Sequence, residues 1–416
     1  MILATAAVWG VCAVTTAGVI VRPFRWPEAV WAMLGAAALV VAGLVPWHAA
    51  VAAAARGGDV YLFLTGMMLL SETAQRQGLF DWVAAAAVAR ARGSTPRLFA
   101  LVYAAGVAIT VFLSNDATAV VLTPAVYAAA RRAEADPLPL LFACALVANA
   151  ASFVLPISNP ANLVLYGGTP PPLGAWLAAF AWPSLASILV TFAMLRWAER
   201  RRIAGRCADP ADRAALPAGG RAALAGIAAT ALVLLAASAI GADLGLPTAA
   251  AGIATTLIVC AIGRDRPLAV VRGVAWGVLP LVAGLFVLVE ALARTGAIAA
   301  VAAALGRLSA DPLAGGAVAG TVLALAANLV NNLPAGLIAS SAVTLAEPPR
   351  LVVDALLIGV DLGPNLSVTG SLATILWLQA IRREGGDIGF LRFLRVGAVT
   401  MIPALVAALG LRLAAG

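Results

Sequence analysis

Long apolar runs constrain what this chain can fold into more than any other feature. Segments of about 18 or more mostly apolar residues recur along its whole length, and runs of that length are typical of transmembrane helices. Of its 416 residues, 63% are hydrophobic and only 11% are charged, whereas a soluble domain is roughly half apolar and a quarter charged. The sequence therefore predicts an all-α polytopic membrane protein.

Arginine marks the side of the membrane on which each loop lies. The chain has no Lys, and short Arg-rich loops face the cytoplasm. We interpret this distribution as topological and expect no nucleic-acid partner. The first run has no basic n-region and no A-x-A-like cleavage site, so we interpret it as a retained span. The pattern predicts a multi-pass protein of the inner (plasma) membrane with both termini outside.

The charge pattern divides the chain into about 10 transmembrane spans, two re-entrant hairpins and a surface helix. The surface helix is expected at the cytoplasmic face, at residues 76–92. The predicted spans are 2–20, 29–45, 60–75, 138–170, 179–196, 222–241, 246–262, 277–293, 351–381 and 396–414.

The predicted hairpins have polar residues at their centres. Residues 98–130 have Arg on both flanks, so both ends lie in the cytoplasm and "SND" (114–116) falls at the midpoint. At about 1.5 Å per residue, this segment suits two half-membrane helices. Residues 313–346 carry "NN" (331–332) at the centre and are expected to enter from outside. Irregular backbone at such depth is tolerated only where it faces protein or water, so each tip is expected to line a site.

Two of the predicted spans are broken helices, and the whole pattern occurs twice. The breaks are "LPISNPAN" (155–162) and "DLGPNLSVTGS" (361–371), because Pro and Gly interrupt helical hydrogen bonding. "ETAQRQG" (72–78) matches "EALARTG" (290–296), and the two halves run in opposite directions through the membrane. Inverted repeats with broken helices are typical of secondary transporters. The predicted units are a first repeat at 1–195, a cytoplasmic linker at 196–221 and a second repeat at 222–416.

Three stretches resemble the arsenical pump membrane protein (ArsB) family of the ion transporter superfamily. They are "SNDATAVVLTP", "NNLPAGL" and "IGVDLGPNLSVTGSLATILWL" (358–378), and the resemblance runs from about residue 20 to the C-terminus. It implies a scaffold domain, a transport domain and proton-driven export of arsenite and antimonite, in some members with a cytoplasmic ATPase subunit. Many members carry Lys where Asn365 stands and an acid where Asn149 stands. A sodium- or proton-coupled carboxylate or anion carrier of the same superfamily stays open as the alternative.

Neutral arsenite is a trihydroxide, and a site for it needs amides, hydroxyls and free backbone groups rather than a cationic clamp. The hairpin tips and helix breaks supply such groups, although the same residues could merely cap turns and hold helices together. The predicted substrate-binding residues are Ser114, Asn115, Asn159, Asn331, Asn332, Ser367 and Thr369.

Acidic residues inside spans are candidates for proton coupling. Asp116 at a hairpin tip ranks first and Asp361 at a helix break ranks second, because burial in a low dielectric favours a protonated carboxyl. Glu72 and Glu290 each have an Arg four residues later, which is typical of a structural helix pair. The sequence contains no metal cluster, nucleophile triad or Gly-rich phosphate loop. It predicts a carrier rather than an enzyme, without cofactor or resident metal, and leaves open whether it is a homodimer.

Overall fold

The computed structural model describes residues 2–167, 170–208 and 215–416, and helices are the only regular elements longer than a single bridge in these ranges. The first half contains α1 (Ile2–Val21), η1 (Pro23–Arg25), α2 (Glu28–Val41), α3 (Trp47–Ala55), α4 (Gly58–Arg76), α5 (Leu79–Ala91), α6 (Thr95–Phe112), α7 (Asn115–Ala117), η2 (Thr118–Leu122), α8 (Thr123–Arg132), α9 (Pro137–Ala150), η3 (Pro156–Ser158), α10 (Pro160–Leu165), α11 (Leu173–Ala198) and α12 (Arg200–Ile203). The second half contains α13 (Ala218–Ala239), α14 (Gly245–Gly263), α15 (Pro267–Gly273), α16 (Val278–Arg294), α17 (Ala297–Leu308), α18 (Pro312–Val330), α19 (Asn332–Ala346), α20 (Arg350–Leu362), η4 (Gly363–Leu366), α21 (Leu372–Arg383) and α22 (Phe390–Ala414).

The prediction of an all-α polytopic membrane protein is confirmed. Seven helices within the described ranges are long and apolar enough to cross a membrane, and an eighth span results if α15 and α16, bent by 42°, are taken together. Four predicted spans are not among these eight: the two broken helices, which the structure divides into shorter pieces, the 14-residue helix α2 and the helix α4. Two of the seven, α6 and α18, were predicted as legs of hairpins rather than as spans. The seven are α1, α6, α11, α13, α14, α18 and α22.

In both segments predicted as hairpins, helical parts are joined at the expected polar residues, and their re-entry into the membrane stays a prediction. The first leg of the first hairpin, α6, has 18 residues, and the first leg of the second hairpin, α18, has 19. At about 1.5 Å per residue these legs approach 30 Å, so they are longer than the half-membrane helices that the sequence predicted. The helix expected at 76–92 is α5, whose apolar side packs against α6 and α8. The sequence predicted no helix where α3, α15 and α17 lie.

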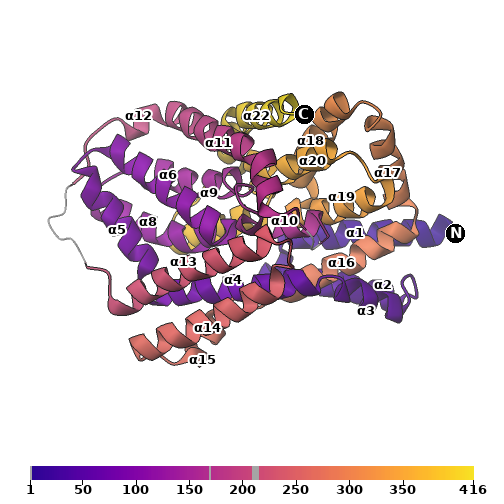
Figure 1. Ribbon diagram of the computed structural model, residues 1–416, viewed down its shortest axis with the longest axis horizontal. Coiled ribbons are helices and arrows are strands. Elements are labelled where there is room, and N and C mark those ends of the chain that lie inside the picture. The colour runs from indigo at the N-terminus through magenta and orange to yellow at the C-terminus, as the bar shows by residue number, and fades with distance from the viewer. Residues whose placement is uncertain (1, 168–169, 209–214) are drawn as a thin grey trace.

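The order of elements in the second half repeats that of the first. Thus α13 corresponds to α1, α14 corresponds to α2, and the correspondence continues to α22, which corresponds to α11. The packing repeats as well, because α2 lies on α16 in the way that α14 lies on α4. In Figure 1, α5, α6 and α8 lie at the left and α17, α18 and α19 at the right, with α10 between them. The inverted orientation of the halves in the membrane stays a prediction.

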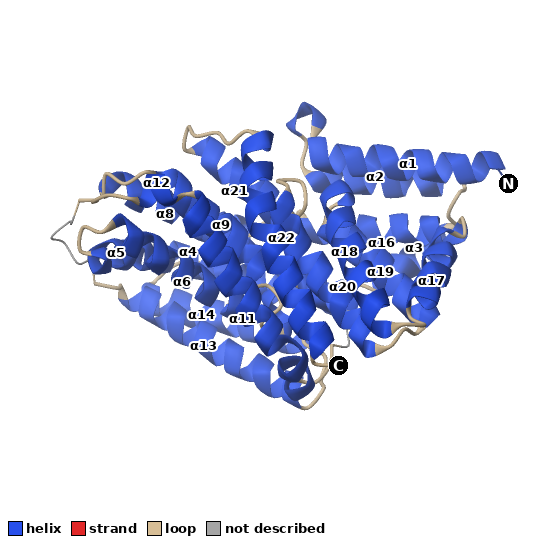
Figure 2. Ribbon diagram, turned by 90° about the horizontal axis from the view of Figure 1, so that it is seen from above, coloured by secondary structure: helices blue, strands red, loops and turns tan. Residues whose placement is uncertain are grey.

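The two halves interlock at their broken helices. The short helix after the first break, α10, packs on the second hairpin through α19, while α21 packs on the first hairpin through η2 and α8. The last helices of the two halves, α11 and α22, also pack together, and they lie near one another in Figures 1 and 2. Each half therefore supplies one side of the region where the tips and breaks meet.

Candidate functional site

The first tip is capped by its own polar side chains. Ser114 has an extended backbone, and its Oγ accepts a hydrogen bond of 3.1 Å from the Ala117 N–H. Asn115 Oδ1 accepts one of 2.9 Å from the Asp116 N–H. These bonds satisfy N–H groups that begin the second leg. The next turn is a π-helix at Thr118–Leu122, which suits a position just before Pro124 because Pro has no N–H to donate.

The second tip is held by the break between α20 and α21. Asn331 adopts a φ of 77° and a ψ of 153°, a conformation that costs a non-Gly residue on the order of 1–3 kcal/mol. Its Nδ2 donates to the Thr369 carbonyl at 3.3 Å, and the Asn332 N–H donates to the Gly370 carbonyl at 2.8 Å. The strained tip is thus fixed from the second break.

Asn328, which the sequence interpretation missed, supports the same break. Its Nδ2 donates to the Ala324 and Gly363 carbonyls at 2.8 and 3.0 Å, and its Oδ1 accepts from Ser367 Oγ at 2.8 Å. Thr369 Oγ1 donates to the Asn328 carbonyl at 3.0 Å. The sequence "NLVNN" could have identified Asn328 as a residue near the tip, because it lies one helical turn before Asn331 and Asn332.

The two helix breaks cross at a fully buried polar network. Asp361 at the end of α20 lies with its Oδ2 2.6 Å from Ser152 Oγ and its Oδ1 2.8 Å from Asn159 Nδ2. Asn149 Nδ2 donates to Asn365 Oδ1 at 3.0 Å. Asn149 and Asn365 are therefore direct partners, joined by a neutral amide pair.

Four of the predicted site residues line one small cavity between the tips. Asn115, Asp116, Asn159 and Asn332 surround this tip cavity of about 10 Å³, which has room for about one water. Asn332 Oδ1 is buried there and accepts no hydrogen bond from any described residue. The apolar side chains in its wall include Leu64, Val278, Leu333 and Leu372.

A first large cavity, of about 570 Å³, reaches the tip cavity. Both are lined by Leu64, Asp116, Pro160 and Val278. The charged residues lining the large cavity are three carboxylates and one guanidinium: Glu72, Asp116, Glu384 and Arg383. Its mouth therefore lies at the Arg-rich end of α21, on the side that the sequence predicts to be cytoplasmic.

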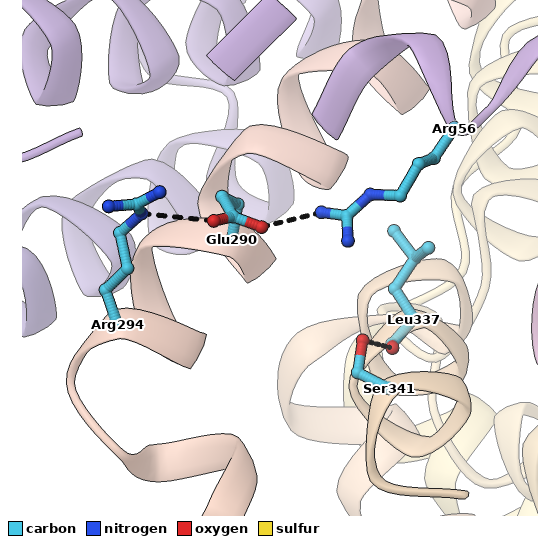
Figure 3. Close-up of polar contacts among 5 residues, drawn as sticks. All are labelled: Arg56, Glu290, Arg294, Leu337 and Ser341. Atoms are coloured by element: carbon cyan, nitrogen blue, oxygen red, sulfur yellow. Dashed lines mark hydrogen bonds and ion pairs between the residues drawn. The ribbon is translucent and has the colours of Figure 1, made fainter. Parts of the chain in front are cut away.

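A second large cavity, of about 490 Å³, shares no lining residue with the tip cavity. Figure 3 shows its charged group, in which Glu290 lies between Arg56 and Arg294. Arg56 Nη2 lies 2.7 Å from Glu290 Oε2, and Arg294 Nε lies 3.0 Å from Oε1. The predicted Glu72–Arg76 pair also forms, at 2.6 Å. Both predicted pairs are confirmed, and each glutamate also lines a large cavity.

Apolar side chains separate the second cavity from the tip cavity. Leu163, Val164 and Leu337 line the second cavity, one turn along from Pro160 and Leu333, which line the tip cavity. A septum about one helical turn thick therefore closes the site on this side. On the other side, the tip cavity adjoins the first large cavity, with which it shares four lining residues.

The remaining predicted residues lie outside the tip cavity. Ser114 lines the first large cavity, whereas Asn331, Ser367 and Thr369 are occupied by the hydrogen bonds of the second tip and break. The sequence interpretation also missed Asp354, which is buried and bound at 2.8 Å by Arg412 Nη2 and at 2.6 Å by the Tyr166 hydroxyl. The roles of all these residues in transport stay predictions.

Two helical tips and two broken helices that enclose buried amides are typical of one class of protein, the membrane transporters. The family model described as citrate transporter (CitMHS) matches residues 11–359, and the chain belongs to this family.

Curated relatives place the chain near arsenical pumps. It is 26% identical over 368 residues to an arsenical pump membrane protein of Escherichia coli, covering 83% of this chain and 85% of that protein. It is 26% identical over 405 residues to an uncharacterized transporter of Mycobacterium tuberculosis, covering 92% of each. The resemblance to arsenical pump membrane proteins is thereby confirmed.

A solved structure supports the fold. The YdaH transporter of Alcanivorax borkumensis superposes with a TM-score of 0.57 at 16% sequence identity, covering 88% of this chain and 86% of that one. This similarity concerns the fold alone.

Proposed function

We propose that this protein exports arsenite and antimonite from the cytoplasm in exchange for protons, by alternating access at the tip cavity. The observation that carries the proposal is the hydrogen-bonding character of that cavity. Asn332 Oδ1 is buried without a partner, and no hydrogen bond or ion pair joins the Asp116 carboxylate to a described side chain. These groups are acceptors, so a ligand bound here should donate hydrogen bonds, and arsenite supplies three hydroxyls. Because the cavity holds about one water in this conformation, the proposal requires the two tips to separate when arsenite binds.

The first large cavity favours a neutral substrate over an anionic one. Its lining has three carboxylates against one guanidinium, and like charges in a low-dielectric cleft repel strongly. Arg76 compensates the charge of Glu72, so a carboxylate substrate would be repelled chiefly by Asp116 on its way to the tip cavity, whereas uncharged arsenite would meet no such barrier. Because this cavity leads to the tip cavity, we propose that it is the cytoplasmic loading path.

Proton coupling is proposed for Asp116. It lines both the tip cavity and the first large cavity, so it can exchange a proton with water and contact a substrate hydroxyl. Antiport requires that proton and substrate disfavour each other at one site. A protonated Asp116 accepts fewer hydrogen bonds from the substrate hydroxyls, so proton binding weakens substrate binding, as antiport requires.

Transport of a carboxylate such as citrate is the second candidate, and the citrate transporter family match is what favours it. The two candidates predict different effects of the acidic lining. Neutralising Glu384 in the first cavity, by Glu384→Gln, should leave arsenite transport nearly unchanged but should increase entry of an anion.

The deciding experiment measures uptake into everted membrane vesicles with an acidic interior, with and without sodium and without ATP. We expect arsenite uptake that collapses with a protonophore, does not require sodium and is not competed by citrate. Citrate uptake without arsenite uptake would overturn the proposal in favour of the carboxylate carrier. Uptake that appears only when a cytoplasmic ATPase subunit and ATP are added would overturn the proton-driven mechanism.

A further inference from the structure

The carboxyl group of Asp361 has a hydrogen-bond pattern that determines its protonation state. The residue is completely buried at the end of α20. Its Oδ1 accepts from Asn159 Nδ2 at 2.8 Å, and its Oδ2 lies 2.6 Å from Ser152 Oγ. The same Ser152 Oγ lies 2.7 Å from the Asn149 backbone carbonyl oxygen.

Counting donors shows which atom carries the hydrogen between Ser152 and Asp361. A hydroxyl has one hydrogen, and a backbone carbonyl is an acceptor only. If Asp361 were ionised, Ser152 would face two acceptors at hydrogen-bond distance with one proton to give. If Asp361 Oδ2 carries a proton, it donates to Ser152 Oγ, and Ser152 donates to the Asn149 carbonyl. Every close contact is then a normal hydrogen bond.

No described cation neutralises Asp361 instead. The charged residue of α22 that points into this part of the fold is Arg412, and it is bound to Asp354 at 2.8 Å. Asp354 also binds the Tyr166 hydroxyl at 2.6 Å and lies 3.6 Å from Arg350. Asp354 lies seven residues before Asp361, about two helical turns away. The described parts of α9, α18 and α19 bring no charged side chain to the crossing.

Asp361 also differs from Asp116 in its access to water. It lines neither of the large cavities nor the tip cavity, whereas Asp116 lines two of the three. A proton held at Asp361 therefore cannot be released directly into any of these three cavities in this conformation.

We propose that Asp361 is a neutral carboxylic acid that keeps its proton through the transport cycle and positions the two helix breaks, with Ser152 as the acceptor of that proton. The inference rests on the proposed function only in assigning coupling to Asp116 alone. It predicts that an amide can replace the acid, because Asn at position 361 would donate through Nδ2 to Ser152 and accept through Oδ1 from Asn159.

The test compares Asp361→Asn with Asp116→Asn in purified, reconstituted protein. Infrared spectroscopy should show the carbonyl band of a neutral carboxylic acid that is absent from Asp361→Asn and present in Asp116→Asn. In the wild type the band should persist at alkaline pH and on addition of sodium or arsenite. Ser152→Ala should shift the band to higher frequency, because the proton loses its acceptor. This readout requires no transport, so it stands apart from the substrate assignment.

Two further measurements can overturn the proposal. Asp361→Asn should melt close to the wild type and keep gradient-driven uptake within about twofold, whereas Asp361→Leu, which cannot make either bond, should lose stability. A stable Asp361→Asn that loses the pH-gradient dependence of uptake would make Asp361 a coupling residue. Loss of the band at alkaline pH or on sodium addition would show that the proton is exchanged or that a cation replaces it.

Discussion

Replacing Asn332 with Leu should change stability and substrate binding in opposite directions. Asn332 is 3% exposed, and its Oδ1 accepts no hydrogen bond from the residues that the structure describes. A buried polar group without a partner costs about 1–3 kcal/mol. Leu has nearly the same shape and meets Leu64, Leu333 and Leu372, which already line the cavity. Because the one water that fits in the cavity can donate to Oδ1, the variant measured without substrate should gain stability by only part of that amount.

Substrate binding should weaken by a similar free energy, because the variant lacks the acceptor for one substrate hydroxyl. A loss of about 1–3 kcal/mol corresponds to an affinity roughly 5–150-fold lower. The backbone bond from the Asn332 N–H to the Gly370 carbonyl is kept, so the tip should stay in place. The assays are thermal unfolding of the detergent-purified protein and the concentration dependence of arsenite uptake.

Asn115→Leu is the matched control at the first tip. Asn115 Oδ1 accepts from the Asp116 N–H at 2.9 Å, so this variant should unfold more easily and also transport poorly. If Asn332→Leu unfolds more easily than the wild type, Asn332 has a structural partner and the reasoning about its unpaired oxygen is refuted. Unchanged uptake by a stabilised Asn332→Leu would remove this residue from substrate binding.

Three other outcomes are expected. Asp116→Asn should abolish uphill export driven by a pH gradient yet keep exchange of arsenite down its own gradient, and full gradient-driven export would exclude Asp116 as the proton carrier. Arg412→Met should destabilise the protein by less than the roughly 3–5 kcal/mol of an unpaired buried charge, because Arg350 and the Tyr166 hydroxyl still contact Asp354, and adding Asp354→Asn should recover much of the loss in thermal unfolding. Cys placed at the exposed positions Arg97 and Glu134, in a variant without the native cysteines, should react with an impermeant reagent only from the cytoplasmic side, and labelling from opposite sides would contradict the hairpin topology.

The tips and breaks could be predicted because they oppose their surroundings in the sequence. The polar sequences Ser-Asn-Asp and Asn-Asn each interrupt a run of apolar residues. Both form tips between helices, with the predicted residues at their centre. The same reasoning located the second break, where α20 ends at Leu362 and α21 begins at Leu372.

The side chains that line the site could not be chosen by the same means. Ser367 and Thr369 have hydroxyls that could bind a substrate, yet both hydroxyls hydrogen-bond to Asn328 instead. Asp354 was overlooked because its partner Arg412 lies 58 positions away. Whether a buried polar group faces a cavity or a protein partner depends on long-range packing, which periodicity and spacing do not encode.

The thin apolar septum beside the tip cavity has a consequence for the energy supply of the cell. Cavities of about 570 and 490 Å³ lie on either side of the tip cavity, and if they face opposite sides of the membrane, as the topology predicts, about one turn of Leu, Val and Pro side chains is the barrier to ions. A file of water through that layer would conduct protons continuously and dissipate the gradient without moving any cargo. Excluding water prevents such leakage. The dryness of this layer therefore acts as electrical insulation, and a polar substitution at Leu337 would turn a carrier into a proton leak.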